Sequence, residues 1–168
     1  PGYFSHYHNR NRYQFFTLMT LGATLGVFLS DDLYTTFIFF EMMSLASYCW
    51  VVEEETAGAR KAGKTYLTIA VIGGMITLMG LFLLWNLTGT LELSSLKALC
   101  LAVDGTRKTE LYAAAFCILI GFGAKAGMFP VHIWLPKAHP VAPAPASALL
   151  SGVLTKTGIL GILVVTAN

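Results

Sequence analysis

Long runs of uncharged, apolar residues constrain this sequence more than any other feature. A helix needs roughly 20 apolar residues to cross the hydrocarbon core of a bilayer, which is about 30 Å thick. A membrane-spanning strand would alternate apolar and polar residues over about ten positions, whereas these runs are continuous. We therefore expect an all-α bundle of five membrane-spanning helices behind an extramembrane N-terminal segment, residues 1–12. The helices are expected over residues 13–30, 33–52, 65–85, 111–129 and 146–165.

Composition agrees with an integral membrane protein. Hydrophobic residues make up 55% of the chain and charged residues 12%, whereas a soluble domain carries about 25% charged residues. The net charge of +2 indicates no nucleic-acid partner. The three cysteines form no CxxC pair, so neither a disulfide framework nor a metal site is indicated. Because no iron–sulfur cysteine run is present, we expect no cofactor in this chain.

The ends of the chain and its basic residues bear on topology. The sequence starts at Pro1 and stops at Asn168 while an apolar segment is running out, so we expect an interior piece of a longer polypeptide. The basic residues divide six to three between the two sides of the expected bundle, and the positive-inside rule places the larger group in the cytoplasm. The larger group is Arg10, Arg12, Arg60, Lys61, Lys64 and Lys137, and the smaller is Lys97, Arg107 and Lys108.

Prolines cluster over residues 130–145, directly after the fourth expected span. Proline removes a backbone donor and clashes with the preceding helical turn. We therefore predict that the fourth helix breaks after Lys125 and continues irregularly to about residue 139. Irregular backbone at membrane depth is tolerated where it is buried in protein or lines a wet cavity, and broken helices are common in transporters.

Three ionisable residues, Glu41, Lys125 and Lys156, interrupt the expected spans. Each costs on the order of 2.5–3.5 kcal/mol at the centre of a spanning helix, whereas an apolar neighbour returns only about 0.3–0.6 kcal/mol. Such residues normally face the bundle interior and mark ion pathways. A lysine that loses and regains a carboxylate partner can release and rebind a proton. The alternative is a static buried ion pair that fixes helix packing.

Two histidines, His132 and His139, lie in the proline-rich stretch. Either imidazole could extend a proton path, cap backbone carbonyls or sit at the interface. Their spacing of seven residues does not indicate haem ligation, because Pro136 lies between them. Lys64, at the start of the third expected span, could extend its ammonium to the interface.

Two segments carry a family resemblance. Residues 125–158, KAGMFPVHIWLPKAHPVAPAPASALLSGVLTKTG, resemble the signature of the proton-conducting antiporter-like subunits. Such subunits occur in respiratory complex I, in Mrp cation/proton antiporters, and in membrane-bound hydrogenases and formate hydrogenlyase. Residues 30–48, SDDLYTTFIFFEMMSLASY, resemble the helix that carries the essential glutamate of that family. The resemblance extends over nearly the whole chain from about residue 13.

The resemblance implies a role for individual residues. Glu41 matches the glutamate of the family's fifth helix, and Lys125 matches the lysine of the broken seventh helix with which that glutamate pairs. Lys156 matches the lysine of the eighth helix, which passes protons towards the centre of the subunit. His132 matches the histidine of the FPxHxWLP stretch. Lys64 matches a basic residue at the start of the sixth helix.

The family fold has about fourteen helices in two inverted repeats, of which this chain would hold helices four to eight. One departure is Lys137, because an aspartate usually follows WLP in the family. That difference puts a local salt bridge at this position in doubt.

The resemblance implies a multi-pass subunit that moves H⁺ or Na⁺ through a relay of Glu41, Lys125 and Lys156. Redox chemistry, if the assembly has any, would belong to neighbouring subunits. The expected partners are other membrane subunits, including homologous antiporter-like ones, and the bilayer. The expected location is a bacterial or archaeal inner membrane. A structural membrane subunit that conducts nothing remains the alternative function.

Overall fold

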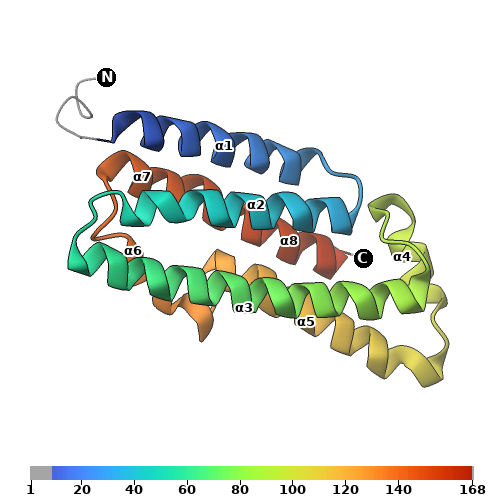
Figure 1. Ribbon diagram of the computed structural model, residues 1–168. Coiled ribbons are helices and arrows are strands. Elements are labelled where there is room, and N and C mark those ends of the chain that lie inside the picture. Colours follow the sequence, from blue (N-terminus) through green and yellow to red (C-terminus); the bar gives the residue numbers. More distant parts are fainter. Residues whose placement is uncertain (1–8, 168) are drawn as a thin grey trace.

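The chain forms a bundle of helices that lie side by side along one direction (Figure 1). The computed structural model describes residues 9–167, and the extended backbone pairing recorded there is one isolated bridge between Asp32 and Glu92. The elements are α1 (Arg10–Leu29), α2 (Leu33–Val52), α3 (Ala57–Thr88), α4 (Leu93–Ala102), η2 (Gly105–Arg107), α5 (Lys108–Ala126), η3 (Val131–Trp134), α6 (Leu135–Ala138), α7 (Ala144–Leu149), the π-helical turn η4 (Leu150–Leu154) and α8 (Thr155–Ala167).

Four helical segments of the described chain are long and apolar enough to cross a membrane: Leu33–Val52, Ala57–Thr88, Gly105–Ala138 and Ala144–Ala167. They correspond to four of the five expected spans. The segment expected to form the first span is helical in α1 but falls outside this set, since Arg10, Arg12 and Gln14 lower the apolarity of its first turns. Its crossing of the membrane stays a prediction. Of the expected N-terminal segment, residues 1–8 lie outside the described residues.

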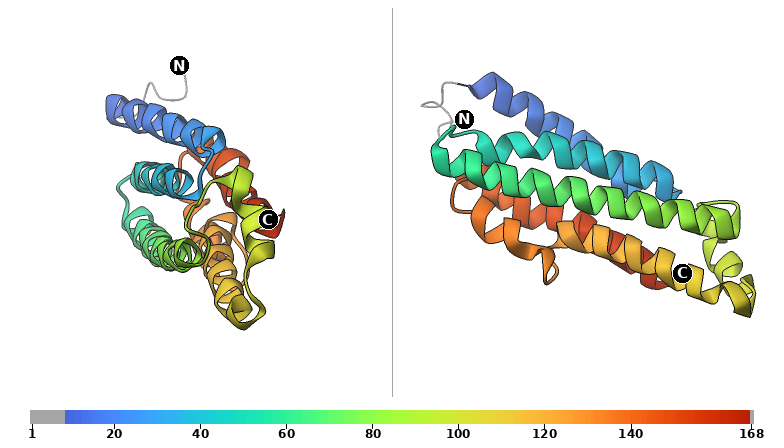
Figure 2. Two further views of the ribbon diagram at one scale, coloured as in Figure 1. Left: turned by 90° about the vertical axis from the view of Figure 1, so that its right-hand side faces the viewer. Right: turned by 60° about the horizontal axis from the view of Figure 1, so that its bottom comes forward.

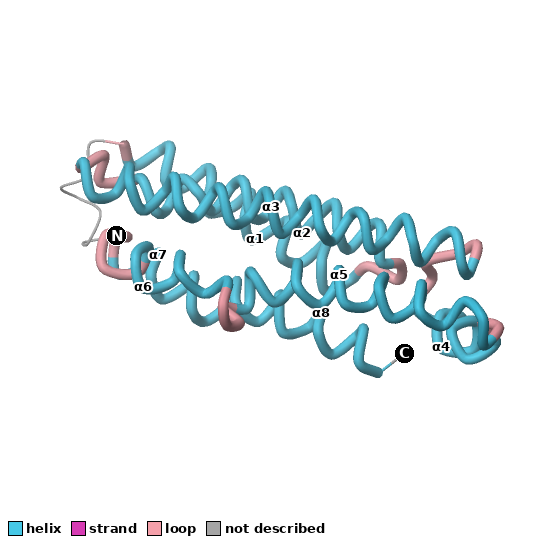
Figure 3. The backbone as a smooth tube through the Cα atoms, turned by 90° about the horizontal axis from the view of Figure 1, so that it is seen from below, coloured by secondary structure: helices cyan, strands magenta, loops and turns pink. Residues whose placement is uncertain are grey.

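Each long helix packs against the next in a chain of neighbours. Helix α1 contacts α2, α2 contacts α3, α3 contacts α5, and α5 contacts α8. The end-on view in Figure 2 shows α1 outermost against α2, with α3 and α5 on the other side of α2. The view from below shows α6 and α7 at one end of the bundle and α4 at the other (Figure 3).

Helices α3 and α5 approach closely through small residues. A Cβ atom on Gly121 would lie 2.7 Å from the carbonyl oxygen of Gly73 and would collide with the Thr77 hydroxyl. Small residues allow this approach between membrane helices, whose association depends on close packing. The close contact fixes α5, and with it Lys125, against α3.

Helix α3 begins eight residues before the expected start of the third span. The side chain of Thr56 accepts a hydrogen bond from the Ala59 amide at 3.1 Å, so the helix has its N-cap well ahead of the apolar run. Its first turns carry charged residues at 60, 61 and 64, and the apolar run of the helix follows them. Gly89, with φ 72°, ends the helix.

The connection between α3 and α5 contains the helix α4. Leu91 and Leu96 are buried there. Backbone hydrogen bonds tie this connection to the start of α2, from the Leu33 amide to the Leu91 carbonyl at 3.0 Å and from the Leu93 amide to the Asp31 carbonyl at 2.9 Å. The connection therefore packs on the end of the bundle.

The predicted break after Lys125 is present. Helix α5 ends at Ala126, and Gly127 takes up a left-handed conformation with φ 81°. The chain continues through η3 and α6 rather than as one straight helix. The indole of Trp134 donates a hydrogen bond of 2.7 Å to the Ala124 carbonyl, so the broken segment folds back onto the end of α5.

Basic residues occupy both ends of the bundle in the expected grouping. The starts of α1 and α3, with Arg10, Arg60 and Lys61, lie at one end, and α4 and η2, with Lys97 and Arg107, lie at the other (Figure 1). The end that faces the cytoplasm stays a prediction.

Candidate intramembrane ion site

Lys125 is buried in the last turn of α5, where only 4% of its surface is exposed. Its Nζ donates a hydrogen bond to the Tyr66 hydroxyl. The same ammonium lies 4.4 Å from the centroid of the Tyr66 ring and 5.9 Å from that of Trp134. Both distances fall within the range of cation–π attraction. Lys125 is therefore held by neutral aromatic groups.

Tyr66 connects three helices. Its hydroxyl lies 2.6 Å from the Ser47 hydroxyl and 3.4 Å from the Ser44 carbonyl oxygen, both on α2. Its ring meets that of Trp134 edge to face, with centroids 5.1 Å apart. The polar chain thus runs from Lys125 on α5 through Tyr66 on α3 to α2.

Glu41 projects from the central turns of α2 against α3. Its carboxylate faces Gly74, and a Cβ atom at that position would lie 2.5 Å from Oε1. The oxygen Oε1 is buried and has no hydrogen-bond partner among the described residues. An unpaired buried acceptor is costly, so this oxygen is the least satisfied atom of the Glu41 carboxylate.

Glu41 and Lys125 lie near each other but do not form an ion pair. Among the described residues, ion pairs within 4.0 Å involve Arg12 and Arg107 and not Lys125. Gly74 faces the Glu41 carboxylate, and the adjacent Gly73 lies against Ala124, the residue before Lys125. The structure therefore brings the predicted pair into the same region and leaves its members separated.

A small cavity of about 10 Å³ adjoins the Lys125 side chain. This volume accommodates about one water-sized sphere. Ser44, whose buried hydroxyl oxygen has no partner among the described residues, lines the cavity together with Tyr66, Lys125 and Trp134. The site thus contains a space about the size of one water molecule beside the Lys125 side chain.

Lys156 is not part of this cluster. It is exposed in the first turn of α8. The packed face of that turn is formed instead by its neighbours: Thr157 is buried and bonds the Leu154 carbonyl at 2.7 Å, and Gly158 lies against the backbone of α5. Lys156 therefore faces away from Glu41 and Lys125.

The remaining predicted residues lie in separate surroundings. His132 is half-buried in η3, with its ring centroid 5.7 Å from that of Phe129, and its buried Nδ1 has no partner in the described chain. His139 pairs through Nδ1 with the Ser147 hydroxyl at 2.6 Å. Lys64 is exposed and lines a surface hollow of about 410 Å³ at the α2–α3 end of the bundle.

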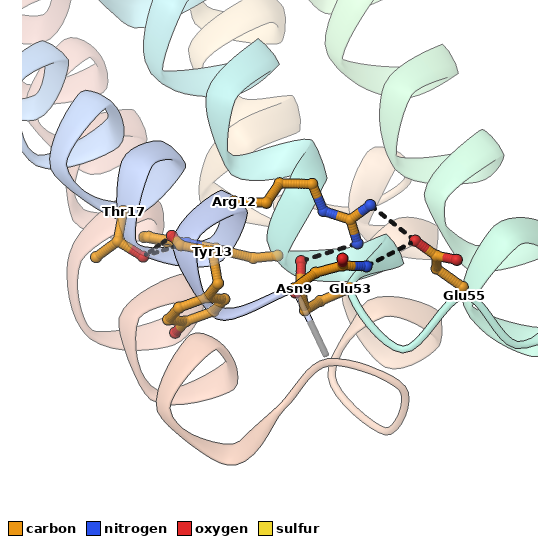
Figure 4. A network of polar contacts seen from close by, with 7 residues as sticks. Asn9, Arg12, Tyr13, Thr17, Glu53 and Glu55 are labelled. Carbon is orange, nitrogen blue, oxygen red and sulfur yellow. Dashed lines mark hydrogen bonds and ion pairs between the residues drawn. The ribbon is translucent and has the colours of Figure 1, made fainter. Parts of the chain in front are cut away.

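A second charged cluster, at that end of the bundle, was not predicted. Figure 4 shows Arg12 reaching from α1 to Glu53 and Glu55, which follow α2. Arg12 donates to Glu55 Oε1 at 2.7 Å and to Glu53 Oε2 at 3.3 Å. Asn9 donates to Glu55 at 3.4 Å. We call these four residues the terminal charge cluster. Burial raises the pKa of Glu53, and the charge of Arg12 opposes that shift.

Tyr66 and Ser47 were missed in the sequence. The third span was expected to start at residue 65, which would place Tyr66 at the interface, where tyrosines are common. Because α3 starts at Ala57, Tyr66 lies well inside the helix. No group of three or more histidine, cysteine or acidic side chains with the geometry of a metal site is found within residues 9–167.

Comparison with known proteins places this geometry in context. Residues 30–167 match the family described as "NADH:quinone oxidoreductase/Mrp antiporter, TM". Hydrogenase-4 component B of Escherichia coli (strain K12) is 38% identical over 155 residues, which cover 92% of this chain and 22% of the relative. A Na(+)/H(+) antiporter subunit of Alkalihalophilus pseudofirmus is 33% identical over 156 residues, 92% of this chain and 31% of the relative. The chain thus spans less than a third of the length of these relatives.

Solved membrane complexes contain the same fold. A chain of an archaeal membrane-bound sulfane sulfur reductase superimposes with a TM-score of 0.82 and 25% identity, covering 89% of this chain and 30% of the other. A chain of the Mrp complex from Dietzia sp. DQ12-45-1b gives a TM-score of 0.79 and 27% identity, covering 90% and 28%. A chain of respiratory complex I from Thermus thermophilus, at 20% identity, shares the fold with a TM-score of 0.76.

Proposed function

This chain belongs to the NADH:quinone oxidoreductase/Mrp antiporter family of membrane subunits, and we propose that it moves H⁺ or Na⁺ through a relay of Glu41, Lys125 and Lys156. One observation carries the proposal: Lys125 is buried and held by neutral groups while a buried oxygen of nearby Glu41 has no partner among the described residues. Intramembrane ionisable residues of this kind usually mark ion pathways.

The chemistry of the relay depends on a pair that opens and closes. A carboxylate beside an ammonium favours the charged form of each, whereas separation in an apolar site disfavours both charges. Lys125 would therefore take up a proton when it approaches Glu41 and release it when it moves away. The cavity beside Lys125 gives the proton or a water molecule a place to pass.

Further steps involve Lys156 and His132. Lys156 stands on an exposed face of α8, from which it would hand the ion to parts of the protein outside this chain. His132 has a buried Nδ1 without a partner in the described chain, and this nitrogen would take its place on the ion path as a hydrogen-bonding group. Lys64, exposed at the end of the bundle, would repel cations there and so influence where they enter.

The setting of this activity is a multi-subunit complex in a bacterial or archaeal inner membrane. The similar solved chains belong to Mrp, sulfane sulfur reductase and complex I assemblies. Other membrane subunits would therefore be the partners, and they would supply redox energy or a second ion for exchange. The alternative of a non-conducting subunit held by a static Glu41–Lys125 bridge gains no support, since no such bridge is recorded in the described part of the chain.

Ion pumping by the intact complex in sealed vesicles tests the proposal, with wild type compared against Lys125→Met. Methionine keeps the length and apolar character of the side chain without its charge. We expect a normally assembled complex that no longer pumps. Lys97→Met, on the exposed face of α4, is the matched control and is expected to pump normally. Unchanged pumping in Lys125→Met would refute the relay.

A further inference from the structure

We infer that Tyr66 is a positioning residue whose hydroxyl, anchored by Ser47, holds the Lys125 ammonium apart from Glu41. This inference rests on the proposed function, because it concerns the open arrangement of the Glu41–Lys125 pair. Tyr66 contributes no proton of its own in this role. It sets where the ammonium rests between transfers.

The hydroxyl of Tyr66 is suited to this role by its partners. It accepts the hydrogen bond from Lys125, and it can donate its own proton to Ser47 or to the Ser44 carbonyl. Ser47 is buried and also lies 3.1 Å from the Ser44 carbonyl oxygen. The phenol oxygen is therefore fixed from the side of α2, and its lone pairs point to a defined place on the side of α5.

Burial strengthens this arrangement. Only 1% of Tyr66 is exposed, and Ser47 and Lys125 are buried as well, so bulk water does not compete for the ammonium. Hydrogen bonds to charged groups are about twice as strong as those between neutral groups. The ring adds attraction through its face, since Nζ lies 4.4 Å from the centroid.

The broken segment after α5 holds the tyrosine ring in place. Trp134 packs edge to face against Tyr66, and its indole is bonded to the carbonyl of Ala124, the residue before Lys125. The break therefore ties the backbone next to Lys125 to the ring that receives the ammonium.

Glu41 is the competing partner. Its carboxylate lies against Gly74, where the missing side chain leaves room for it, and Oε1 has no partner in the described structure. An equilibrium between two positions responds only to interactions that differ between them. The Tyr66 hydroxyl bonds the ammonium in the separated arrangement, and the carboxylate attracts it in the paired one. Loss of the hydroxyl is expected to shift Lys125 towards Glu41.

Tyr66→Phe in the intact complex tests the inference, because it removes the hydroxyl and keeps the ring. We expect normal assembly, pumping reduced about tenfold as one charged hydrogen bond is lost, and, by electron cryomicroscopy, Lys125 Nζ within ion-pairing distance of Glu41. The control Tyr112→Phe, on the exposed face of α5, is expected to match wild type. The double variant Tyr66→Phe/Glu41→Gln is expected to leave Nζ near its wild-type place, since the attracting charge is gone.

Ser47→Ala provides a second route if the Tyr66 variant assembles poorly. It removes the anchor of the phenol without touching Lys125, and we expect the same shift of Nζ with a smaller loss of pumping. Wild-type pumping and an unmoved Nζ in Tyr66→Phe would overturn the inference. If Lys125→Met abolishes pumping in the same assay, the inference fails alone. If Lys125→Met pumps normally, the proposed function fails with it.

Discussion

Arg12, at one end of the bundle, meets two carboxylates, whereas Lys125, in the interior, meets none within ion-pairing distance among the described residues. The terminal charge cluster joins the start of α1 to the turn after α2, and the one positive charge of Arg12 lies between two carboxylates (Figure 4). The interior site joins α2, α3 and α5 through hydroxyl groups, and a Glu41 oxygen stays unsatisfied within the described chain.

The two sites differ in how their charges are compensated. At the end of the bundle, the Arg12 side chain remains 38% exposed. Ion pairing there carries only a small desolvation cost, because the guanidinium keeps part of its contact with water. In the interior, separated charges are expensive, and close helix packing keeps them in place. Paired charges at the end therefore fix α1, whereas the separated charges inside are the ones that we propose exchange a proton.

The largest effect is expected from Gly121→Ala. The added methyl group would collide with the Thr77 hydroxyl and the Gly73 backbone and push α5 from α3, which costs about 1–3 kcal/mol for an overpacked core. Thermal unfolding of the purified protein in detergent measures this loss. Gly58→Ala, near the terminal charge cluster, meets Val141 only at 3.8 Å and is expected to be neutral. Equal destabilisation of both variants would contradict a tightly packed interior.

A more selective effect is expected from Gly74→Ala. Its methyl group would press on the Glu41 carboxylate, which has no hydrogen bond through Oε1 in the described chain to hold it and can move aside. We predict that the pumping rate falls about tenfold, which corresponds to an activation free energy raised by about 1.4 kcal/mol, and that the complex still assembles. Pumping assays in vesicles and quantification of assembled complex measure both quantities. Wild-type pumping would show that the position of the carboxylate does not matter.

Arg12→Met is expected to lower stability without affecting pumping, because it removes the cation of the terminal charge cluster. Both bonds to the acidic residues are lost, and Glu53 is left buried without its cation. Breaking a fully buried pair costs about 3–5 kcal/mol, and exposure of Arg12 lowers this to about 1–2 kcal/mol. The unfolding temperature is expected to fall accordingly while pumping per assembled complex stays the same. A pumping defect without a loss of stability would contradict this account, because it would give the terminal charge cluster a role in ion transport instead of in stability.

The smallest effect concerns pH. Burial raises the pKa of Glu53 above its ordinary value of 4.5, with Arg12 opposing the shift. Between the ordinary pKa and the raised one, the folded state binds more protons than the unfolded state, so stability falls as pH rises through that window. Glu53→Gln is expected to remove this slope in unfolding measured from acidic to neutral pH. If the pH dependence of stability is unchanged in Glu53→Gln, another ionisable group must cause it.

Much of the architecture could be predicted because it follows from apolarity and backbone chemistry. The helical segments, the break after Lys125 and the ionisable residues at 41 and 125 all carry local signals. The expected span began at residue 65, whereas helix α3 begins at Ala57, because the helix runs through charged residues that follow the Thr56 cap. The sequence therefore did not indicate that Tyr66 lies in the interior of the bundle.

The pairings could not be predicted because they join distant parts of the chain. Lys125 and Tyr66 are 59 residues apart, and Arg12 and Glu53 are 41 apart. Instead of the expected contact with Glu41, Lys125 forms a hydrogen bond with Tyr66. The choice between these partners depends on how the helices pack in three dimensions, which the sequence does not state. Lys156 was expected in the same relay, but the small residues Thr157 and Gly158 form the packed face of its turn and direct the lysine outward.

The most direct test compares two carboxylates about twelve positions apart on the sequence, Glu41→Gln and Glu53→Gln, in the intact complex. Both substitutions remove one negative charge and keep the side-chain shape. Ion pumping in sealed vesicles, normalised to assembled complex, is the measurement. We predict that Glu41→Gln abolishes pumping with normal assembly and that Glu53→Gln pumps like wild type. Equal pumping by both variants, or a loss confined to Glu53→Gln, would contradict the assignment of ion transport to the interior site.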